Sequence, residues 1–117
     1  MGNAYVLLSL LLAMLLTYSG IGKIRRAPRQ VRVIYLTVHV PLKYFPWLAA
    51  CEFAGELGLL VGLWLRPIGI AAAIGVVLYF VGAVTAHLRV GDIKGVGSAV
   101  FMLGLSAGVL VLRMLIP

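Results

Sequence analysis

Residues 47–67 read WLAACEFAGELGLLVGLWLRP, and this stretch decides the fold. From Trp47 to Leu65 it is long enough to cross a hydrocarbon core roughly 30 Å thick, at about 1.5 Å of helix per residue. It nevertheless contains Glu52 and Glu56, two of the three acidic residues in the chain. A charged group near the bilayer centre costs roughly 2.5–3.5 kcal/mol on insertion scales. The fold must therefore contain something that compensates for these two carboxyl groups.

The whole chain has the composition of a membrane protein. Of its 117 residues, 63% are hydrophobic and only 11% are charged, and the mean hydropathy is +1.14. A water-soluble globule cannot bury that much apolar surface. We predict a single transmembrane domain, residues 1–117, with four spans at about 4–21, 47–65, 68–86 and 96–112. Because the last two connections are short, the predicted fold is an all-α integral membrane protein built as an antiparallel four-helix bundle.

The basic residues are distributed unevenly between the predicted loops. Eight lie in loops 22–46 and 87–95, and two, Arg66 and Arg113, lie on the other side. By the positive-inside rule both loops are cytoplasmic, both termini are outside, and the protein is a multi-pass protein of the cell membrane. The net charge of +7 thus predicts topology and contact with lipid phosphates rather than nucleic-acid binding.

The segment from Pro28 to Pro46 has two interpretations. Apolar side chains at 31, 34, 35 and 38 recur at helical spacing, with basic residues opposite them, which is typical of an interfacial helix between the first and second spans. Pro41 would end such a helix. The alternative is a cytoplasmic loop with accidental periodicity.

Small residues recur every fourth position on three of the predicted spans. Helices in lipid associate where small side chains let their backbones approach closely, so we predict that these residues are helix-packing positions. A homodimer through the fourth span is an alternative role for its glycines. The positions are Ala54, Gly58, Gly62, Gly82, Ala86, Gly104 and Gly108.

The predicted topology gathers polar groups in one leaflet. The first and third spans end, and the second begins, at the same side, so a contact of Lys23 or His87 with Glu52 would neutralise the carboxylate. We predict a polar pocket there, formed by Glu52, Glu56, His87, Lys23 and Arg89. The alternative is a structural ion pair that only fixes the helix register.

No motif in the chain assigns catalytic residues. There is no phosphate-binding glycine loop, zinc-ligand spacing or nucleophile triad, so we expect no metal site. Cys51 is the only cysteine, and apolar surroundings make it a poor nucleophile. We therefore do not expect the chain to be an enzyme by itself.

Several motifs together resemble the DoxX and DoxX-like membrane proteins. The stretches are GKI at 22–24, VPLKYFPWLAACE at 40–52, EFAGELGLLVGLWLRPIGIAAA at 52–73 and AHLRVGD at 86–92, which together cover almost the whole chain. The resemblance implies a four-helix membrane bundle with Glu52 and His87 at positions where the family typically has those residue types. Glu56 departs from the pattern, which generally has a small or apolar residue there. The anchors are Gly22, Lys23, Pro41, Glu52, Gly55, Gly58, Gly62, Pro67 and His87.

The resemblance implies several functions, because members of the family are associated with quinone-linked sulfur oxidation, redox-defence assemblies and the assembly of other membrane proteins. Our first hypothesis is an accessory subunit of a larger, redox-linked membrane complex, docked through the glycine faces. The second is a binder of a small lipophilic molecule such as a quinone, held by Glu52 and His87. No cofactor motif is evident, and a quinone is the one cofactor that these hypotheses include. A proton-coupled transporter built from homo-oligomers, with Glu56 carrying the proton, is the third.

Overall fold

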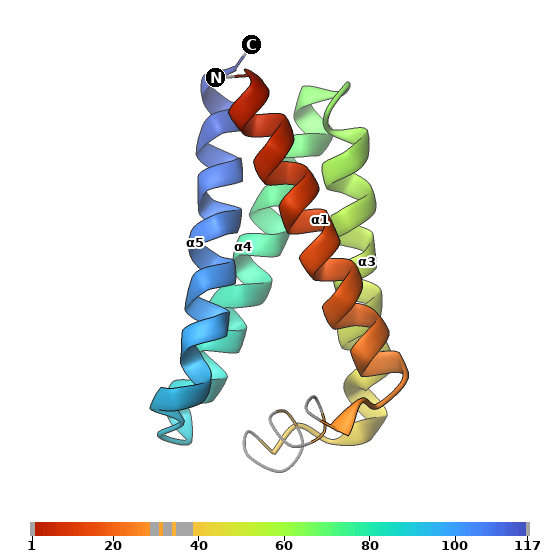
Figure 1. The fold of residues 1–117 in the computed structure, drawn as a ribbon, viewed down its shortest axis with the longest axis vertical. Helices are drawn as coiled ribbons and strands as arrows, with labels where there is room; N and C mark the ends of the chain where they lie inside the picture. Colours follow the sequence, from red (N-terminus) through yellow and green to blue (C-terminus); the bar gives the residue numbers. More distant parts are fainter. Residues whose placement is uncertain (1, 29–30, 32–33, 35–38, 117) are drawn as a thin grey trace.

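The computed structural model describes residues 2–28, 31, 34 and 39–116, and every regular element in them is helical. Four long helices follow one another: α1 (Gly2–Ile24), α3 (Phe45–Val61), α4 (Arg66–Arg89) and α5 (Ile93–Leu115), with the short 3₁₀ helix η2 (Leu42–Tyr44) before α3. Consecutive long helices run in alternating directions, and both chain termini lie at the same end (Figure 1). The all-helical prediction is confirmed for the described residues. A regular antiparallel bundle stays a prediction, because the helices diverge as described below.

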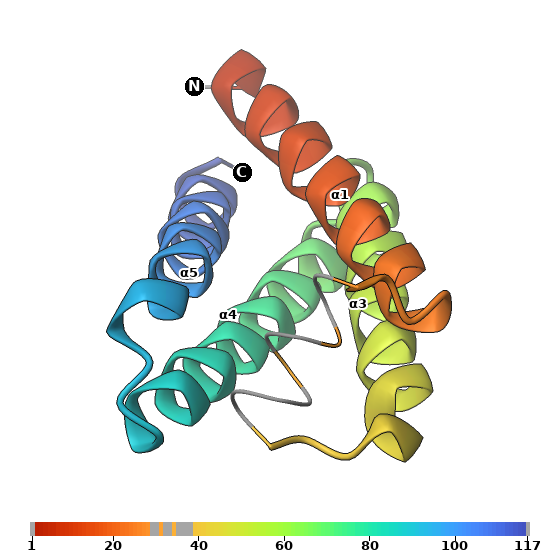
Figure 2. The ribbon, with the colours of Figure 1, turned by 60° about the horizontal axis from the view of Figure 1, so that its bottom comes forward.

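The helices pack in a closed order. α1 contacts α3, α3 contacts α4, α4 contacts α5, and α5 returns to α1. We call the end with the chain termini the terminal end, and the opposite end, where Ile24, Phe45, Arg89 and Ile93 lie, the loop end (Figure 1). α1 and α5 are close at the terminal end and move apart toward the loop end (Figures 1 and 2). The two helices that close the order therefore leave it open at the loop end.

The connection between α3 and α4 is the tightest in the molecule. α3 ends at Val61, four residues before the end of the predicted span, and α4 begins at Arg66 with Pro67 in its first turn, where proline loses no helical hydrogen bond. A Cβ added at Gly62 would lie 2.2 Å from the Gly69 Cα. Glycine at 62 therefore allows the two helices to touch through their backbones.

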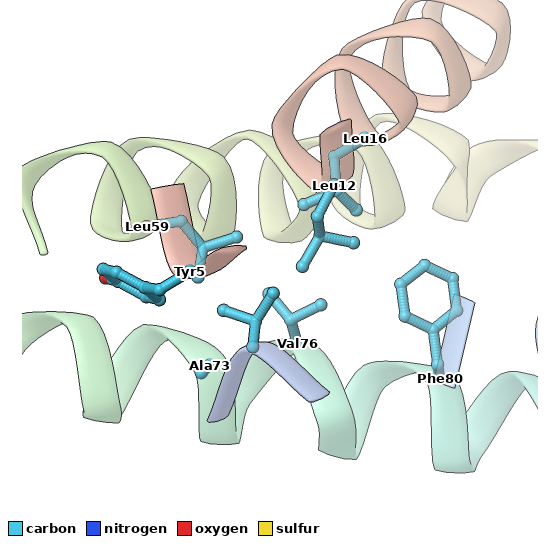
Figure 3. Packing of buried hydrophobic residues seen from close by; sticks show 8 residues of the cluster. Tyr5, Leu12, Leu16, Leu59, Ala73, Val76 and Phe80 are labelled. Carbon is cyan, nitrogen blue, oxygen red and sulfur yellow. The ribbon is translucent and has the colours of Figure 1, made fainter. Parts of the chain in front are cut away.

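The core lies between two pairs of helices, α1 with α3 and α4 with α5. Side chains of α1 and α3 meet those of α4 between the ribbons, with Leu12 and Leu59 facing Val76 (Figure 3). Many large apolar side chains on the outside remain exposed, including Leu7, Met14, Leu57 and Leu78. An apolar outer surface of this kind is consistent with contact with a lipid bilayer. The longest dimension, 43 Å, matches a bilayer with its headgroups, about 40–45 Å.

Three of the helices in the described residues are long and apolar enough to cross a membrane: Gly2–Ile24, Arg66–Arg89 and Val96–Leu115. α3 has 17 residues, about 25 Å of helix, and is the shortest of the four. Most of the predicted interfacial helix, with Arg29, Arg32, Tyr35 and Val38, lies outside the described residues. Which side of the membrane each loop faces stays a prediction.

Candidate functional site

Glu52 is the centre of a polar network inside the helices. Its side chain comes from the first half of α3, and the residue is only 2% exposed. The Oε1 atom accepts hydrogen bonds from Lys23 Nζ at 2.6 Å, Tyr79 Oη at 2.6 Å and Ser19 Oγ at 3.2 Å. Three helices thus converge on one carboxylate oxygen. A full positive charge and two hydroxyl groups replace the water that the carboxylate loses on burial.

Lys23 reaches Glu52 because of the local structure of α1. Ser19 precedes Lys23 by one helical turn, so both side chains lie on the face of α1 that packs against α3. Lys23 Nζ also donates to Ser19 Oγ at 2.6 Å. An ammonium group has three N–H donors, and these contacts use two of them. Its third donor and the Glu52 Oε2 atom have no hydrogen-bond partner among the described residues.

Glu56 has a different environment one turn further along α3. Its Oε1 lies 2.6 Å from Thr17 Oγ1, which in turn lies 2.9 Å from the Ala13 carbonyl oxygen. A hydroxyl group has one proton, so Thr17 cannot donate to both oxygens at once. In the described part of the chain, no cation pairs with Glu56.

His87 is positioned by the turn that ends α4. The Asp92 N–H donates to the His87 carbonyl at 2.9 Å and the Gly91 N–H to the Leu88 carbonyl at 3.1 Å, the two bonds of a Schellman motif. Gly91 has a φ of +70°, which favours glycine. This turn brings the Asp92 carboxylate back to the ring, with Oδ2 2.8 Å from His87 Nδ1. His87 is therefore fixed by Asp92 and is not an ion-pair partner of Glu52.

The Glu52 network and His87 line one cavity of about 570 Å³ in the loop half of the molecule, whereas Glu56, Thr17 and Asp92 do not line it. Small residues of α4, including Gly82 and Ala86, form part of its wall, and Ile34 and Val40 also contribute. A Cβ at Gly82 would meet no atom within 4 Å. The polar wall consists of Ser19, Lys23, Glu52, Tyr79, His87 and Ser98.

The cavity has exposed aromatic residues on the two helices that diverge. Tyr18 of α1 is 71% exposed and Phe101 of α5 is 59% exposed, and both are lining residues. These two helices move apart at this end (Figure 2), so both diverging helices carry exposed residues that line the cavity.

A second cavity of about 560 Å³ lies on the other side of Glu52. Its lining is mainly apolar and includes Cys51, Ala54 and Gly55 of α3 together with Gly75 of α4. Glu52 and Tyr79 line both cavities. The hydrogen-bonded pair therefore contributes to the walls of both cavities.

The remaining predicted residues do not belong to the Glu52 network. Arg89 is exposed at the end of α4 and does not line either cavity. Gly58 and Gly62 lie against Ala72 and Gly69 of α4. Ala54 is exposed, and a Cβ added at Gly104 or Gly108 would meet no atom within 4 Å. The described side chains contain no group of three potential metal ligands.

Four contributors to the site were missed by sequence reasoning: Thr17, Ser19, Tyr79 and Asp92. Two of them carry a signal that the sequence contains. Ser19 is one turn before Lys23, and Asp92 directly follows the glycine that ends α4. Tyr79 lies two turns before His87, at a spacing that shares a helix face, but nothing in the sequence distinguishes it from an interfacial tyrosine.

Comparison with protein families decides the classification. The model of the DoxX-like family matches residues 7–109. The chain belongs to the DoxX-like family. No curated protein and no solved structure matches it. The matched region of this DoxX-like protein contains the whole Glu52 network, His87 and both cavities.

Family membership and the three spanning-length helices together make this DoxX-like chain a multi-pass membrane protein. The resemblance found in the sequence motifs is thereby confirmed. Tyr5 and Arg113 lie outside the matched residues.

Proposed function

We propose that this DoxX-like protein binds one small lipophilic molecule of the quinone class in the loop-half cavity. The observation that supports the proposal is a cavity of about 570 Å³ with a buried ion pair in its wall. That volume lies within the range of small-molecule sites, about 300–1,000 Å³. Such sites are mostly apolar with a few polar groups that orient the ligand, as this lining is.

The polar wall favours a headgroup that both donates and accepts hydrogen bonds. Glu52 Oε2 is an acceptor without a partner among the described residues, and Lys23 Nζ has a donor to spare there. A buried acceptor without a donor is costly. A hydroquinone can donate from one hydroxyl group and accept at an oxygen, so the reduced form of a quinone satisfies both groups once the buried Oε2 turns toward the cavity.

The divergence of α1 from α5 suits a ligand with an apolar tail. Tyr18 of α1 and Phe101 of α5 line the cavity and are exposed, so the surrounding lipid would take the tail while the headgroup lies at Glu52.

The test is to fill the cavity without touching the ion pair. Gly82→Leu places a side chain in the cavity, where a Cβ meets nothing within 4 Å. Gly104→Leu is the matched control, because Gly104 is equally open and does not line the cavity. We expect gently purified wild-type protein and Gly104→Leu to retain a quinone, detected by mass spectrometry of extracted lipids, and Gly82→Leu to lose it. Equal retention by all three, or none by the wild type, would contradict the proposal.

A second candidate function is that of an accessory subunit in a larger membrane complex. The observation that favours it is the open space beside Gly97 and Gly104, exposed glycines of α5 at which an added Cβ would meet no atom within 4 Å. A partner helix could pack closely on such a surface. For this function Gly104→Leu is the test variant and Gly82→Leu is the control. Crosslinked or co-purified partner protein should be lost in Gly104→Leu and kept in Gly82→Leu.

A further inference from the structure

The three acidic side chains of the chain all have partners away from the terminal end. Glu52 pairs with Lys23, Glu56 contacts Thr17, and Asp92 pairs with His87. Arg113, in the last turn of α5, lies at the terminal end. No acidic side chain is therefore left to neutralise it.

Arg113 is a buried cation at that end. The residue is only 6% exposed, and its guanidinium carbon lies 5.2 Å from the centre of the Tyr5 ring. The Tyr5 hydroxyl donates to the Gly62 carbonyl at 3.3 Å, which holds the ring in place. Arg113 Nε is buried without a hydrogen-bond partner among the described residues. A guanidinium group has five N–H donors in a planar fork that matches phosphate geometry.

Arg66 brings a second positive charge to the same end of the molecule. Its Nη2 and Nε donate to the carbonyl oxygens of Met114 at 2.9 Å and Ile116 at 3.2 Å. The Arg66 guanidinium therefore lies against the backbone of the residue that follows Arg113. The two cations have no carboxylate near them within the described chain, and the carbonyl end of α5 offsets only part of their charge.

We propose that Arg113, with Arg66, forms a binding site for a phosphate group, and that a phospholipid headgroup supplies it. The last turn of α5 is at the level where the lipid phosphates of one leaflet lie, given a molecule 43 Å long. The Tyr5 ring covers one side of the guanidinium, and the phosphate takes the N–H edge. This site lies at the opposite end from the loop-half cavity, and two of its residues, Arg113 and Tyr5, lie outside the family match.

The experiment measures headgroup preference in the full chain by native mass spectrometry. The protein is equilibrated with equal amounts of phosphatidylglycerol, phosphatidylcholine and diacylglycerol with identical acyl chains. Wild-type protein should retain phosphatidylglycerol over diacylglycerol by about tenfold, since one net charge-assisted hydrogen bond supplies at least that factor. Arg113→Gln should lose most of this preference. Arg89→Gln, which removes an exposed charge at the loop end, should keep it, and so should Gly82→Leu.

A further arm distinguishes the two sources of phosphate. If inorganic phosphate displaces the bound lipid at millimolar concentration, the site takes free phosphate, and if it does not, the acyl chains contribute and the ligand is the lipid. An equal preference in Arg113→Gln and wild type overturns the proposal, as does an equal loss in Arg89→Gln. Should Arg113→Gln fail to fold, the wild type decides alone: no discrimination between phosphatidylglycerol and diacylglycerol overturns the site.

Discussion

The same four helices pack differently in the two halves of the molecule. In the terminal half, α3 and α4 touch through the backbones of Gly62 and Gly69, and apolar side chains fill the space between the helix pairs. In the loop half, α1 and α5 separate, and the space contains a cavity whose wall carries an ion pair. Close packing and cavity space are therefore divided along the helix axes. The terminal half contains the backbone contact, and the loop half contains the cavity in which we propose that a ligand binds.

The largest expected effect comes from removing the cation of the loop half. Lys23→Met keeps the length of the side chain but leaves Glu52 buried without its positive partner. Breaking a buried pair on one side costs about 3–5 kcal/mol, so the free energy of unfolding in a detergent titration should fall by that order. The polar half would then contribute to stability as well as to binding.

The control for this prediction removes both charges. Lys23→Met with Glu52→Gln leaves no uncompensated ion, and replacing a whole buried pair is often close to neutral. The double variant should recover most of the lost stability while losing the ligand. If the double variant is as unstable as the single one, the cost does not come from an unpaired carboxylate.

The sequence was sufficient to predict much of the helical architecture, and less of the site. The periodic small residues at 58 and 62 and the glutamates at 52 and 56 point to different faces of one helix, and α3 does have α1 on one side and α4 on the other. Topology places Lys23 and His87 at the level of Glu52 without deciding between them, and the structure pairs Glu52 with Lys23. To predict that Tyr79 completes the network, one must know how α4 is oriented about its own axis. Hydrophobic periodicity does not determine that orientation when nearly every residue is apolar.

The cavity also could not be derived from the sequence. Gly82 and Ala86 have the spacing of helix-packing residues. In the structure α1 and α5 diverge, and this face of α4 lines the cavity instead of contacting another helix. Spacing identifies which residues allow a close approach, but it does not identify what approaches them.

The second prediction concerns the close-packed half. Gly62→Ala places a Cβ 2.2 Å from the Gly69 Cα, and backbone atoms cannot move aside as a flexible side chain does. Overpacking costs about 1–3 kcal/mol and occasionally more, so we expect a loss of about 3 kcal/mol in the free energy of unfolding. Gly104→Ala, with open space around it, is the control and should change stability little. Equal effects of both variants would show that the loss does not depend on the backbone contact.

The third prediction tests the hydrogen bond between Tyr79 and Glu52, the two residues that line both cavities. Tyr79→Phe removes the hydroxyl group that donates to Glu52 Oε1 at 2.6 Å and keeps the ring. Hydrogen bonds to charged groups contribute about 1.5–3 kcal/mol, so a loss of about 2 kcal/mol in the free energy of unfolding is expected. Ligand retention, measured by the lipid extraction described above, should fall in the same variant. Unchanged stability would mean that Lys23 and Ser19 alone satisfy the carboxylate.

The smallest effect is expected one turn away from Glu52. Glu56→Gln keeps the shape of the side chain, and the new amide can donate to Thr17 Oγ1 while Thr17 donates to the Ala13 carbonyl. No hydrogen bond is lost, and no described cation loses its partner, so the free energy of unfolding should change by less than about 0.5 kcal/mol. Glu52→Gln, by contrast, leaves Lys23 unpaired and should cost several times more. A loss in Glu56→Gln comparable to that in Glu52→Gln would mean that the charge of Glu56 is needed, and the two glutamates of α3 would then act as one anionic unit.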